Sequence, residues 1–141
     1  MMSVFHTFRI SGSALTAERL RMDTIANNLA NANSTRTEAG GPYQRQMPVF
    51  AARLAEQSLG SGFRGGGVRV VGIHADPSPP RLVYEPGHPD ANEEGYVEYP
   101  NVNVVTEMVD MISATRAYEA NITIINSSRT MAQKALEIGR G

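Results

Sequence analysis

The hydrophobic positions near the N-terminus recur at alternating spacings of four and three residues, the pattern of a helix with one apolar stripe. The row consists of Val4, Phe8, Ser11, Leu15, Glu18, Met22, Ile25, Leu29 and Ala32. Two of its positions are polar, and Gly12 lowers helix propensity by about 1 kcal/mol relative to Ala. We expect an N-terminal helix whose first turns are less regular than its later ones.

The hydrophobic pattern at the C-terminal end is longer and stronger. The same spacing runs through Val104, Met108, Met111, Thr115, Tyr118, Ile122, Ile125, Arg129, Ala132 and Leu136. A second row widens the apolar face: Val105, Val109, Ile112, Ile124, Met131, Ala135 and Ile138. Asn103 can cap the first turn, Glu107 can complement the positive helix end and Gly139 can end the helix. The predicted helix over 103–138 would be roughly 50 Å long, too long to lack a partner.

Between these helices the pattern becomes that of short strands and turns. Strands are predicted at 68–73 and 81–84, and a further short one at 47–50. Five glycines between positions 60 and 67 predict a flexible loop at about 57–67. Pro86 and Pro89 predict an irregular, extended chain up to Pro100.

These elements predict a mainly α fold with a small β insert. We expect the N- and C-terminal helices to pair as an antiparallel coiled coil, with a short β-hairpin or irregular segment between them. The predicted domains are a helical domain of residues 1–35 plus 101–141, and a β-rich, extended insert of residues 36–100.

Each predicted helix contains a stretch without charged side chains, at residues 24–35 and 120–128. A helix face in water normally carries Lys, Arg or Glu. Small and amide side chains there favour burial by neighbouring subunits. An Asn-rich helix pair exposed to water is the alternative.

Composition narrows the possible functions. With 13 basic and 14 acidic residues, the chain lacks the basic stripe of a nucleic-acid-binding protein. The absence of cysteine excludes disulfides, thiol nucleophiles and Cys-based zinc sites. No apolar run approaches the length of a transmembrane helix, and no cleavable signal is visible. We expect no cofactor, no metal and no nucleic-acid partner.

The motifs that could support an enzyme lack their necessary context. The glycine pattern at 60–65 resembles a dinucleotide-binding loop, but no helix is predicted after it. His74 and Asp76 supply too few ligands for a metal. Glu85, Glu93 and Glu94 lie in a Pro/Gly stretch without a predicted apolar pocket that would raise a carboxyl pKa. We predict that the chain is not an enzyme.

The tripeptide His88-Pro89-Asp90 is the one that co-chaperone J-domains place between two antiparallel helices. Its flanks here are turn-like, so we interpret it as a Pro-stiffened turn in which Asp90 bonds nearby amides. A soluble helical adaptor or co-chaperone is the alternative function, and a periplasmic wall-cleaving enzyme is a third.

Two terminal motifs resemble the signatures of the flagellar rod and hook family. Residues 25–35 read IANNLANANST, and the C-terminal motif comprises YPNVN at 99–103, EMVDM at 107–111 and RAYEAN at 116–121. The middle segments GGPYQR at 40–45, DPSPPRLVY at 76–84 and PGHPDAN at 86–92 are similar to those of the proximal rod proteins in this family.

The resemblance implies a structural subunit of the rod in the flagellar basal body. Such a subunit would assemble helically in the periplasm, transmit torque, and contact other rod proteins and copies of itself. It would leave the cell through the flagellar type III export apparatus without a cleaved signal peptide.

Together, the pattern and the resemblance predict an assembly interface made by the terminal helices. Met22, Ile25 and Leu29 are expected to meet the C-terminal helix within one subunit, and helix asparagines are expected to face neighbouring subunits. The predicted interface residues are Met22, Ile25, Asn27, Asn28, Leu29, Asn31, Met108, Met111, Tyr118, Asn121, Ile122 and Ile125.

Overall fold

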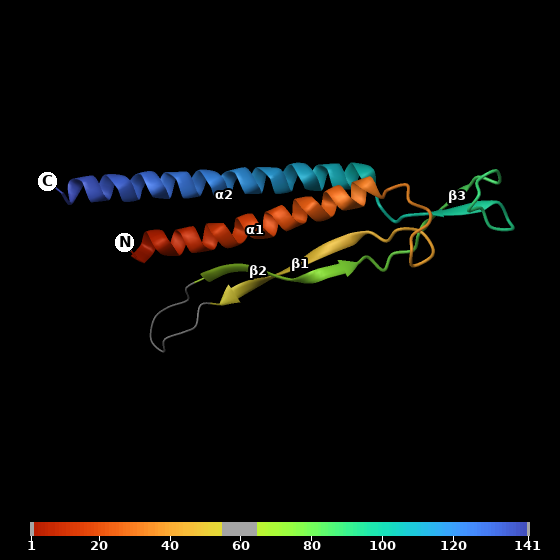
Figure 1. Ribbon diagram of the computed structural model, residues 1–141, viewed down its shortest axis with the longest axis horizontal. Helices are drawn as coiled ribbons and strands as arrows, with labels where there is room; N and C mark the ends of the chain where they lie inside the picture. The colour runs from red at the N-terminus through yellow and green to blue at the C-terminus, as the bar shows by residue number, and fades with distance from the viewer. Residues whose placement is uncertain (1, 55–64, 141) are drawn as a thin grey trace. The chain divides into compact units, whose positions relative to one another are not determined.

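The computed structural model of the chain describes residues 2–54 and 65–140, and of residues 2, 3 and 54 only the backbone. Its elements are α1 (Met2–Ala30), β1 (Gln46–Leu54), β2 (Gly65–Ala75), β3 (Arg81–Tyr84), β4 (Tyr96–Tyr99) and α2 (Val104–Ile138). The two helices pack against each other in opposite directions, and the strands lie between them in the sequence (Figure 1). The prediction of a mainly α fold with a small β insert is therefore confirmed.

Helix α1 is continuous through Gly12, so the expectation of less regular first turns is wrong. Side chains around Gly12 bond to the helix backbone: the Ser13 hydroxyl donates to the Ile10 carbonyl at 2.7 Å, and the Thr16 hydroxyl to the Gly12 carbonyl at 3.1 Å. Ser13 Oγ also accepts the Val68 amide of β2 at 3.1 Å. This tertiary contact offsets the low helix propensity of glycine, which costs only about 1 kcal/mol relative to alanine.

Helix α2 begins and ends where its sequence predicts. The side-chain oxygen of Asn103 accepts the amides of Val105 at 3.1 Å and Thr106 at 3.2 Å, which is the geometry of an N-cap. At the other end the amide of Gly139 donates to the carbonyl of Ala135. The predicted cap at Asn103 is confirmed.

The strands form two two-stranded sheets, β1 with β2 and β3 with β4. In the second sheet, Val83 pairs with Val97 and Tyr84 with Tyr96 in antiparallel register, and Val97 is completely buried. Strand β3 lies where it was predicted. Strand β4 was not predicted, since the chain before Pro100 was expected to be irregular.

The turn before β4 explains this strand. The side-chain oxygen of Asn92 accepts the amides of Glu94 at 3.0 Å and Tyr96 at 2.8 Å, and Gly95 has a φ of 83°. The rings of Tyr84 and Tyr96 then meet edge to face, with centroids 5.3 Å apart. The turn closed by the Asn92 side chain and the contact between the two tyrosine rings therefore stabilise a strand in a Pro/Gly-rich segment.

Prolines and Asn92 also reduce the number of backbone groups at the edges of this hairpin that could pair with another strand. Pro80 precedes β3, Pro86 follows it closely, and Pro100 follows β4. On β4, the Tyr96 carbonyl accepts the Asn92 amide at 2.8 Å, so both backbone groups of Tyr96 are bonded to Asn92. Little of the backbone at the β4 edge is left to pair with another strand.

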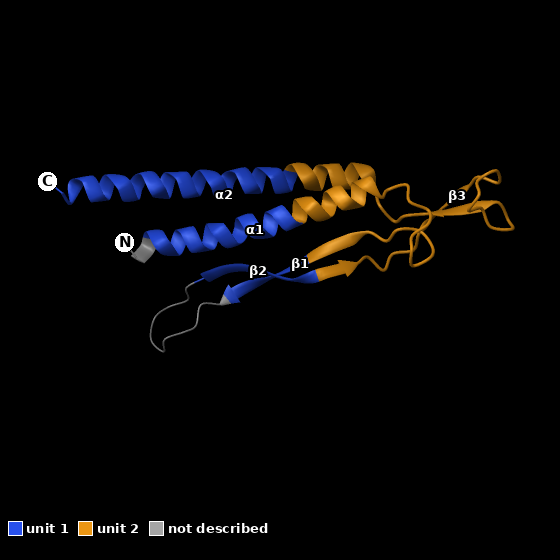
Figure 2. Cartoon of the chain, viewed as in Figure 1, with its two compact units in different colours: residues 1–20, 49–72, 113–141 blue, residues 21–48, 73–112 orange. Residues whose placement is uncertain are grey.

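The chain forms two compact units, and both helices contribute to each (Figure 2). Unit 1 comprises residues 1–20, 49–72 and 113–141, and unit 2 comprises residues 21–48 and 73–112. The division into a helical domain and an insert stays a prediction. Residues 57–64 of the predicted glycine loop lie outside the described residues, whereas Gly65–Gly67 open β2. Gly67 has a φ of 95°, and a Cβ there would overlap Ser13 Oγ.

Candidate assembly surface and its supporting polar cluster

One row of α2 is buried or half-buried, and we call it the inner row. It consists of Glu107, Met111, Ala114, Tyr118, Asn121, Ile125, Ser128 and Ala132, at alternating spacings of four and three. Its most buried side chains are Glu107, Ala114 and Ser128, of which two are small. On α1, three of the buried positions, Ser11, Ala17 and Thr24, are also small. Small residues let two helix backbones approach closely, so this is the face with which α2 packs in the chain.

The large apolar residues of α2 outside the inner row are exposed, and we call them the outer row. They are Val104, Val105, Met108, Val109, Ile112, Ile122, Ile124, Met131, Leu136 and Ile138, with exposures from 38% to 81%. A monomeric soluble protein rarely leaves so many large apolar side chains of one helix uncovered. The outer row is therefore the candidate assembly surface.

The inner row differs by one helix position from the predicted stripe. Both contain Met111, Tyr118 and Ile125, but the alternate positions are Ala114 and Asn121 instead of Thr115 and Ile122. At these positions the predicted stripe passes through the larger side chain of each adjacent pair, whereas close helix packing favours the smaller one. Ile122, one of the predicted interface residues, is 38% exposed in the single chain, and its contacts stay a prediction.

A buried asparagine lies where α1, α2 and the chain entering β1 meet, all within unit 2. The side-chain oxygen of Asn28 accepts the Gln46 amide at 2.9 Å and the Tyr43 hydroxyl at 2.9 Å. Its side-chain nitrogen donates to the Gln46 carbonyl at 2.9 Å and to a Glu107 carboxylate oxygen at 3.0 Å. All four hydrogen-bonding positions of the amide are thus filled, and the side chain is 1% exposed.

Arg45 completes this cluster with three carboxylates. Its guanidinium bonds the fully buried carboxylate of Glu107 and lies 3.6 Å from Asp76 and 3.8 Å from Asp110. Partial burial lowers the pKa of Arg45, but the hydrogen bond and the charges of the carboxylates raise it above its ordinary value. Glu107 was expected only to complement the helix dipole; instead its carboxylate is the buried partner of Arg45 and Asn28.

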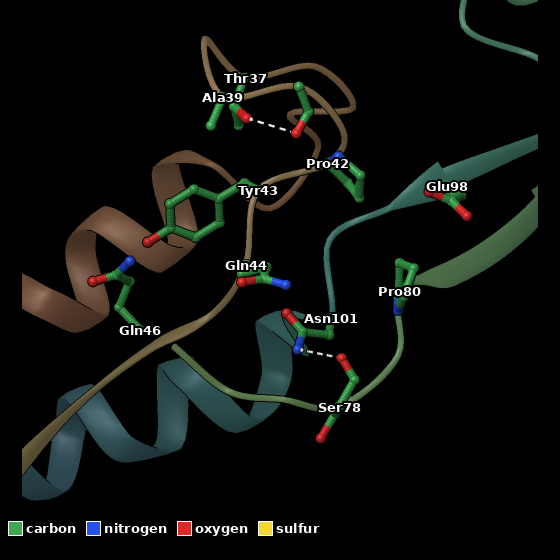
Figure 3. Close-up of a pocket in the computed structure, with 11 residues that line it drawn as sticks. Thr37, Ala39, Pro42, Tyr43, Gln44, Gln46, Ser78, Pro80, Glu98 and Asn101 are labelled. Carbon is green, nitrogen blue, oxygen red and sulfur yellow. Dashed lines mark hydrogen bonds between the residues drawn. The ribbon is translucent and has the colours of Figure 1, made fainter. Parts of the chain in front are cut away.

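Asn101 joins the cluster to the segment before β3. Its side-chain oxygen accepts the Arg45 amide at 2.8 Å, and its nitrogen donates to the Asp76 carbonyl at 3.1 Å. The same nitrogen donates to the Ser78 carbonyl at 3.0 Å (Figure 3). Hydrogen bonds from the Ser78 hydroxyl and amide lower the pKa of Asp76, and the charge of Arg45 lowers it further. We call Asn28, Arg45, Asp76, Asn101 and Glu107 the polar cluster.

Tyr43 lies at the border of the polar cluster. Its hydroxyl accepts a hydrogen bond from Asn27 at 3.1 Å and donates one to Asn28. Partial burial raises the pKa of this phenol; the hydrogen bond from Asn27 opposes the rise and the charge of Glu107 adds to it. Tyr43 therefore stays a neutral donor.

A cavity of about 610 Å³ in unit 2 adjoins this cluster (Figure 3). Tyr43 and Asn101 lie in its wall, but their polar groups are already bonded within the chain. Gln44 and Glu98 are exposed at its rim. Among its described lining residues, Glu98 is the only carboxylate, so no second one is there to pair with it. The cavity therefore offers no acid–base pair of the kind that hydrolysis of a glycosidic bond requires.

The co-chaperone tripeptide forms a turn, not a connection between two helices. The His88 amide donates to the Glu85 carbonyl at 3.0 Å, and the Ala91 amide to the His88 carbonyl at 3.1 Å. The Asp90 carboxylate accepts the Thr35 hydroxyl at 2.9 Å. The predicted turn is confirmed, but Asp90 bonds a hydroxyl instead of the expected amides.

The twelve predicted interface residues fall into three groups in a single chain, while their contacts with other subunits stay a prediction. Ile25 and Asn28 are buried, and Asn28 has no free hydrogen-bonding position. Met108 and Ile122 lie in the exposed outer row. The other eight are half-buried except for exposed Asn27: Met22, Asn27, Leu29, Asn31, Met111, Tyr118, Asn121 and Ile125.

Sequence reasoning missed Arg45, Asp76, Asn101 and the tertiary role of Glu107. Only Glu107 carried a signal, because a carboxylate at that position interrupts the inner row one turn before Met111. A buried carboxylate requires a cationic partner elsewhere in the chain. Nothing in the local pattern around Arg45 identifies it as that partner.

Among the described residues, neither helix has a segment long and apolar enough to cross a membrane.

Comparison with known proteins agrees with this architecture at both ends of the chain. Residues 8–36 match the family model "Flagella basal body rod protein", and residues 93–138 match "Flagellar basal body rod FlgEFG protein C-terminal". The second match contains Asn101 and Glu107, and the first contains Asn28.

Curated relatives match over the whole chain. The flagellar basal-body rod protein FlgC of Borreliella burgdorferi is 49% identical, and that of Bacillus subtilis 48%, each over 99% of this chain and 100% of the relative. FlgC of Escherichia coli is 42% identical over the same shares. The chain therefore belongs to the FlgC family of flagellar basal-body rod proteins.

Proposed function

We propose that this protein is a structural subunit of the proximal rod of the bacterial flagellar basal body, which assembles helically and transmits torque across the periplasm. The family is one of structural proteins, not of enzymes. The observation that carries the proposal is the outer row of α2, an apolar surface that the chain itself leaves uncovered.

The two faces of α2 would have different roles in such a subunit. The inner row and the polar cluster hold the chain together, while the outer row is available to neighbouring subunits. Torque loads every contact in a rod. Many moderate apolar contacts along a 35-residue helix would distribute that load without one strong bond.

The partners that we propose are other rod proteins and further copies of this chain, with the interface including the twelve residues named above. We also propose export through the flagellar type III apparatus without a cleaved signal peptide. The composition supports this proposal, because a chain without cysteine cannot form stray disulfides during export.

The test is the substitution Val109→Asp in a motile host that carries this protein as its only copy. Val109 is 60% exposed on the outer row, so the aspartate would leave the single chain folded but would be buried without a partner in an assembled rod. We expect normal protein levels and secretion, with loss of swimming and of rods in isolated basal bodies.

Val109→Ile is the matched control, because it keeps the apolar surface, and should swim normally. Full swimming by Val109→Asp would exclude the outer row as an assembly surface.

A further inference from the structure

Charge is divided very unevenly between the two compact units. Unit 1 carries nine basic and four acidic residues, a net charge of +5, whereas unit 2 carries four basic and ten acidic residues, a net charge of −6. The near-neutral formal charge of the whole chain conceals this separation. Segregated charge of opposite sign favours a contact between unlike units of two molecules.

The acidic excess of unit 2 lies on the β3–β4 hairpin. Of the four basic residues of unit 2, Arg21, Arg36 and Arg45 are each within 4 Å of a carboxylate of the same unit, and Arg81 on β3 lies over the Tyr99 ring, 5.5 Å from its centroid. Glu93, Glu94 and Glu98 are exposed, and their carboxylates make no ion pair within the described chain. The hairpin therefore presents uncompensated negative charge.

The same hairpin also exposes apolar side chains. Leu82 is 59% exposed, Tyr84 62% and Tyr96 40%, and in the register of the sheet these alternate with buried Val97. Residues 82, 84 and 96 share one face of the pleat with Glu98. An apolar centre with a charged rim is the usual composition of a protein interface.

A complementary surface lies on the second half of α2, in unit 1. Arg129, Lys134 and Arg140 are exposed and make no ion pair within the described chain. By helical spacing, Met131 and Ile138 of the outer row lie on the side of Lys134, and Leu136 lies on the side of Arg129 and Arg140; these apolar side chains are 61%, 81% and 52% exposed. Both the charge and the apolar content of this surface match those of the hairpin.

From these observations we infer that the β3–β4 hairpin of one copy binds residues 124–140 of a second copy. The contact is heterologous, because different surfaces of the two copies meet, so it is repeated head to tail and does not close as a two-fold dimer. This inference rests on the proposed function and specifies a partner and a surface for it.

The first experiment measures self-association of the purified full-length chain by sedimentation velocity. Exposed charges are screened beyond about 10 Å at 0.1 M salt and beyond about 3 Å at 1 M. We expect the average mass to rise with protein concentration at low salt, and the association to weaken at least about tenfold between about 0.05 and 0.5 M NaCl.

The second experiment reverses each surface separately. The hairpin variant is Glu93→Lys, Glu94→Lys and Glu98→Lys, and the helix variant is Arg129→Glu, Lys134→Glu and Arg140→Glu. Each alone should be monomeric. Mixed, they should associate again, because the acidic hairpin of the helix variant can meet the basic helix of the hairpin variant, and the lysine hairpin can meet the glutamate helix.

Glu119→Lys is the matched control, since it adds positive charge to an exposed position of unit 1 and should not weaken association. Wild-type association by either reversed variant, or no complex in the mixture, would overturn the inference. The proposed function fails separately: rods that form normally with only one of the two reversals present leave a rod subunit whose copies meet elsewhere, whereas swimming by Val109→Asp contradicts the outer row itself.

Discussion

The side chain of Asn28 shows how one amide can fix the positions of three segments. It bonds both backbone groups of Gln46, the phenol of Tyr43 and the carboxylate of Glu107. The amide orientation is fixed because the Gln46 N–H can only donate and the Gln46 carbonyl can only accept. No other side chain of similar size offers two donors and two acceptors in this arrangement.

The substitution Asn28→Asp keeps the shape of this side chain but replaces two donors with acceptors. A carboxylate oxygen would then face the half-buried Gln46 carbonyl and the buried Glu107 carboxylate. We expect a loss of about 2–4 kcal/mol in the free energy of unfolding, measured by urea denaturation. Asn33→Asp, at an exposed position nearby, is the control and should change stability by less than about 0.5 kcal/mol. Equal stabilities for the two variants would refute the described hydrogen bonding.

The titration of Asp76 should make the stability of the folded chain depend on pH in the acid range. Its pKa is lower in the folded chain than in the unfolded chain, where it is about 3.9, because Ser78 and Arg45 stabilise the carboxylate. Its stabilising contribution is therefore complete above that value and is lost as the pH falls through the folded pKa. The stability difference between wild type and Asp76→Asn should be constant from about pH 6 to 8 and shrink below about pH 4. A difference that stays constant down to pH 2 would contradict this.

At the scale of elements, the two rows of α2 make different demands on residue size. Ala114 in the inner row is completely buried, whereas Ala120 on the same helix is exposed. Ala114→Leu should therefore destabilise the folded chain by about 1–3 kcal/mol through overpacking. The same change at Ala120 should alter stability by less than about 0.5 kcal/mol. Thermal unfolding followed by circular dichroism makes this comparison, and similar melting temperatures would argue against a close helix approach at Ala114.

The polar cluster also predicts a gradient of local stability along α2. Around Glu107 the helix is tied to Asn28 and Arg45, whereas nearly every side chain after Ser128 is exposed. In dilute monomer, amides near residues 110–114 should exchange with solvent at least about tenfold more slowly than those near residues 130–138. Hydrogen exchange by mass spectrometry measures this, and uniform protection along the helix would show that α2 is fully formed before assembly.

Sequence patterns predicted the elements whose causes are local. Asn103 caps α2 through its own neighbours, and β3 has the alternation and flanking prolines of a strand. Strand β4 was missed because its causes, the Asn92 turn and the pairing with Tyr84, are not visible in a four-residue window. The inner row was misplaced by one position because hydrophobicity favours Ile122, whereas close packing favours Asn121 and Ala114.

The candidate site was less accessible to sequence reasoning than the fold. Glu107 and Arg45 are 62 residues apart in the sequence, so no periodicity connects them. Asn28 was assigned to contacts with neighbours because it lies in a charge-free helix segment. Such a segment indicates burial, but it does not tell whether the burying atoms belong to the same chain or to another.

At the scale of the whole molecule, the outer row and the separation of charge act on different properties of assembly. Apolar area contributes most of the free energy of a contact, whereas charge chooses which surfaces meet and how fast they do so. The Val109→Asp and charge-reversal experiments separate these contributions, because the first changes an apolar position and the second leaves the outer row intact.

The prolines around the β3–β4 hairpin should reduce aggregation of chains that accumulate at high concentration before assembly. An open strand edge can template the addition of strands from other molecules, which is how amyloid fibres grow. Here Pro80 and Pro86 lie on either side of β3, Pro100 removes a donor after β4, and Asn92 occupies the backbone of Tyr96. These residues act as gatekeepers against aggregation, so molecules that crowd together can associate through side chains while their backbones stay unavailable to one another.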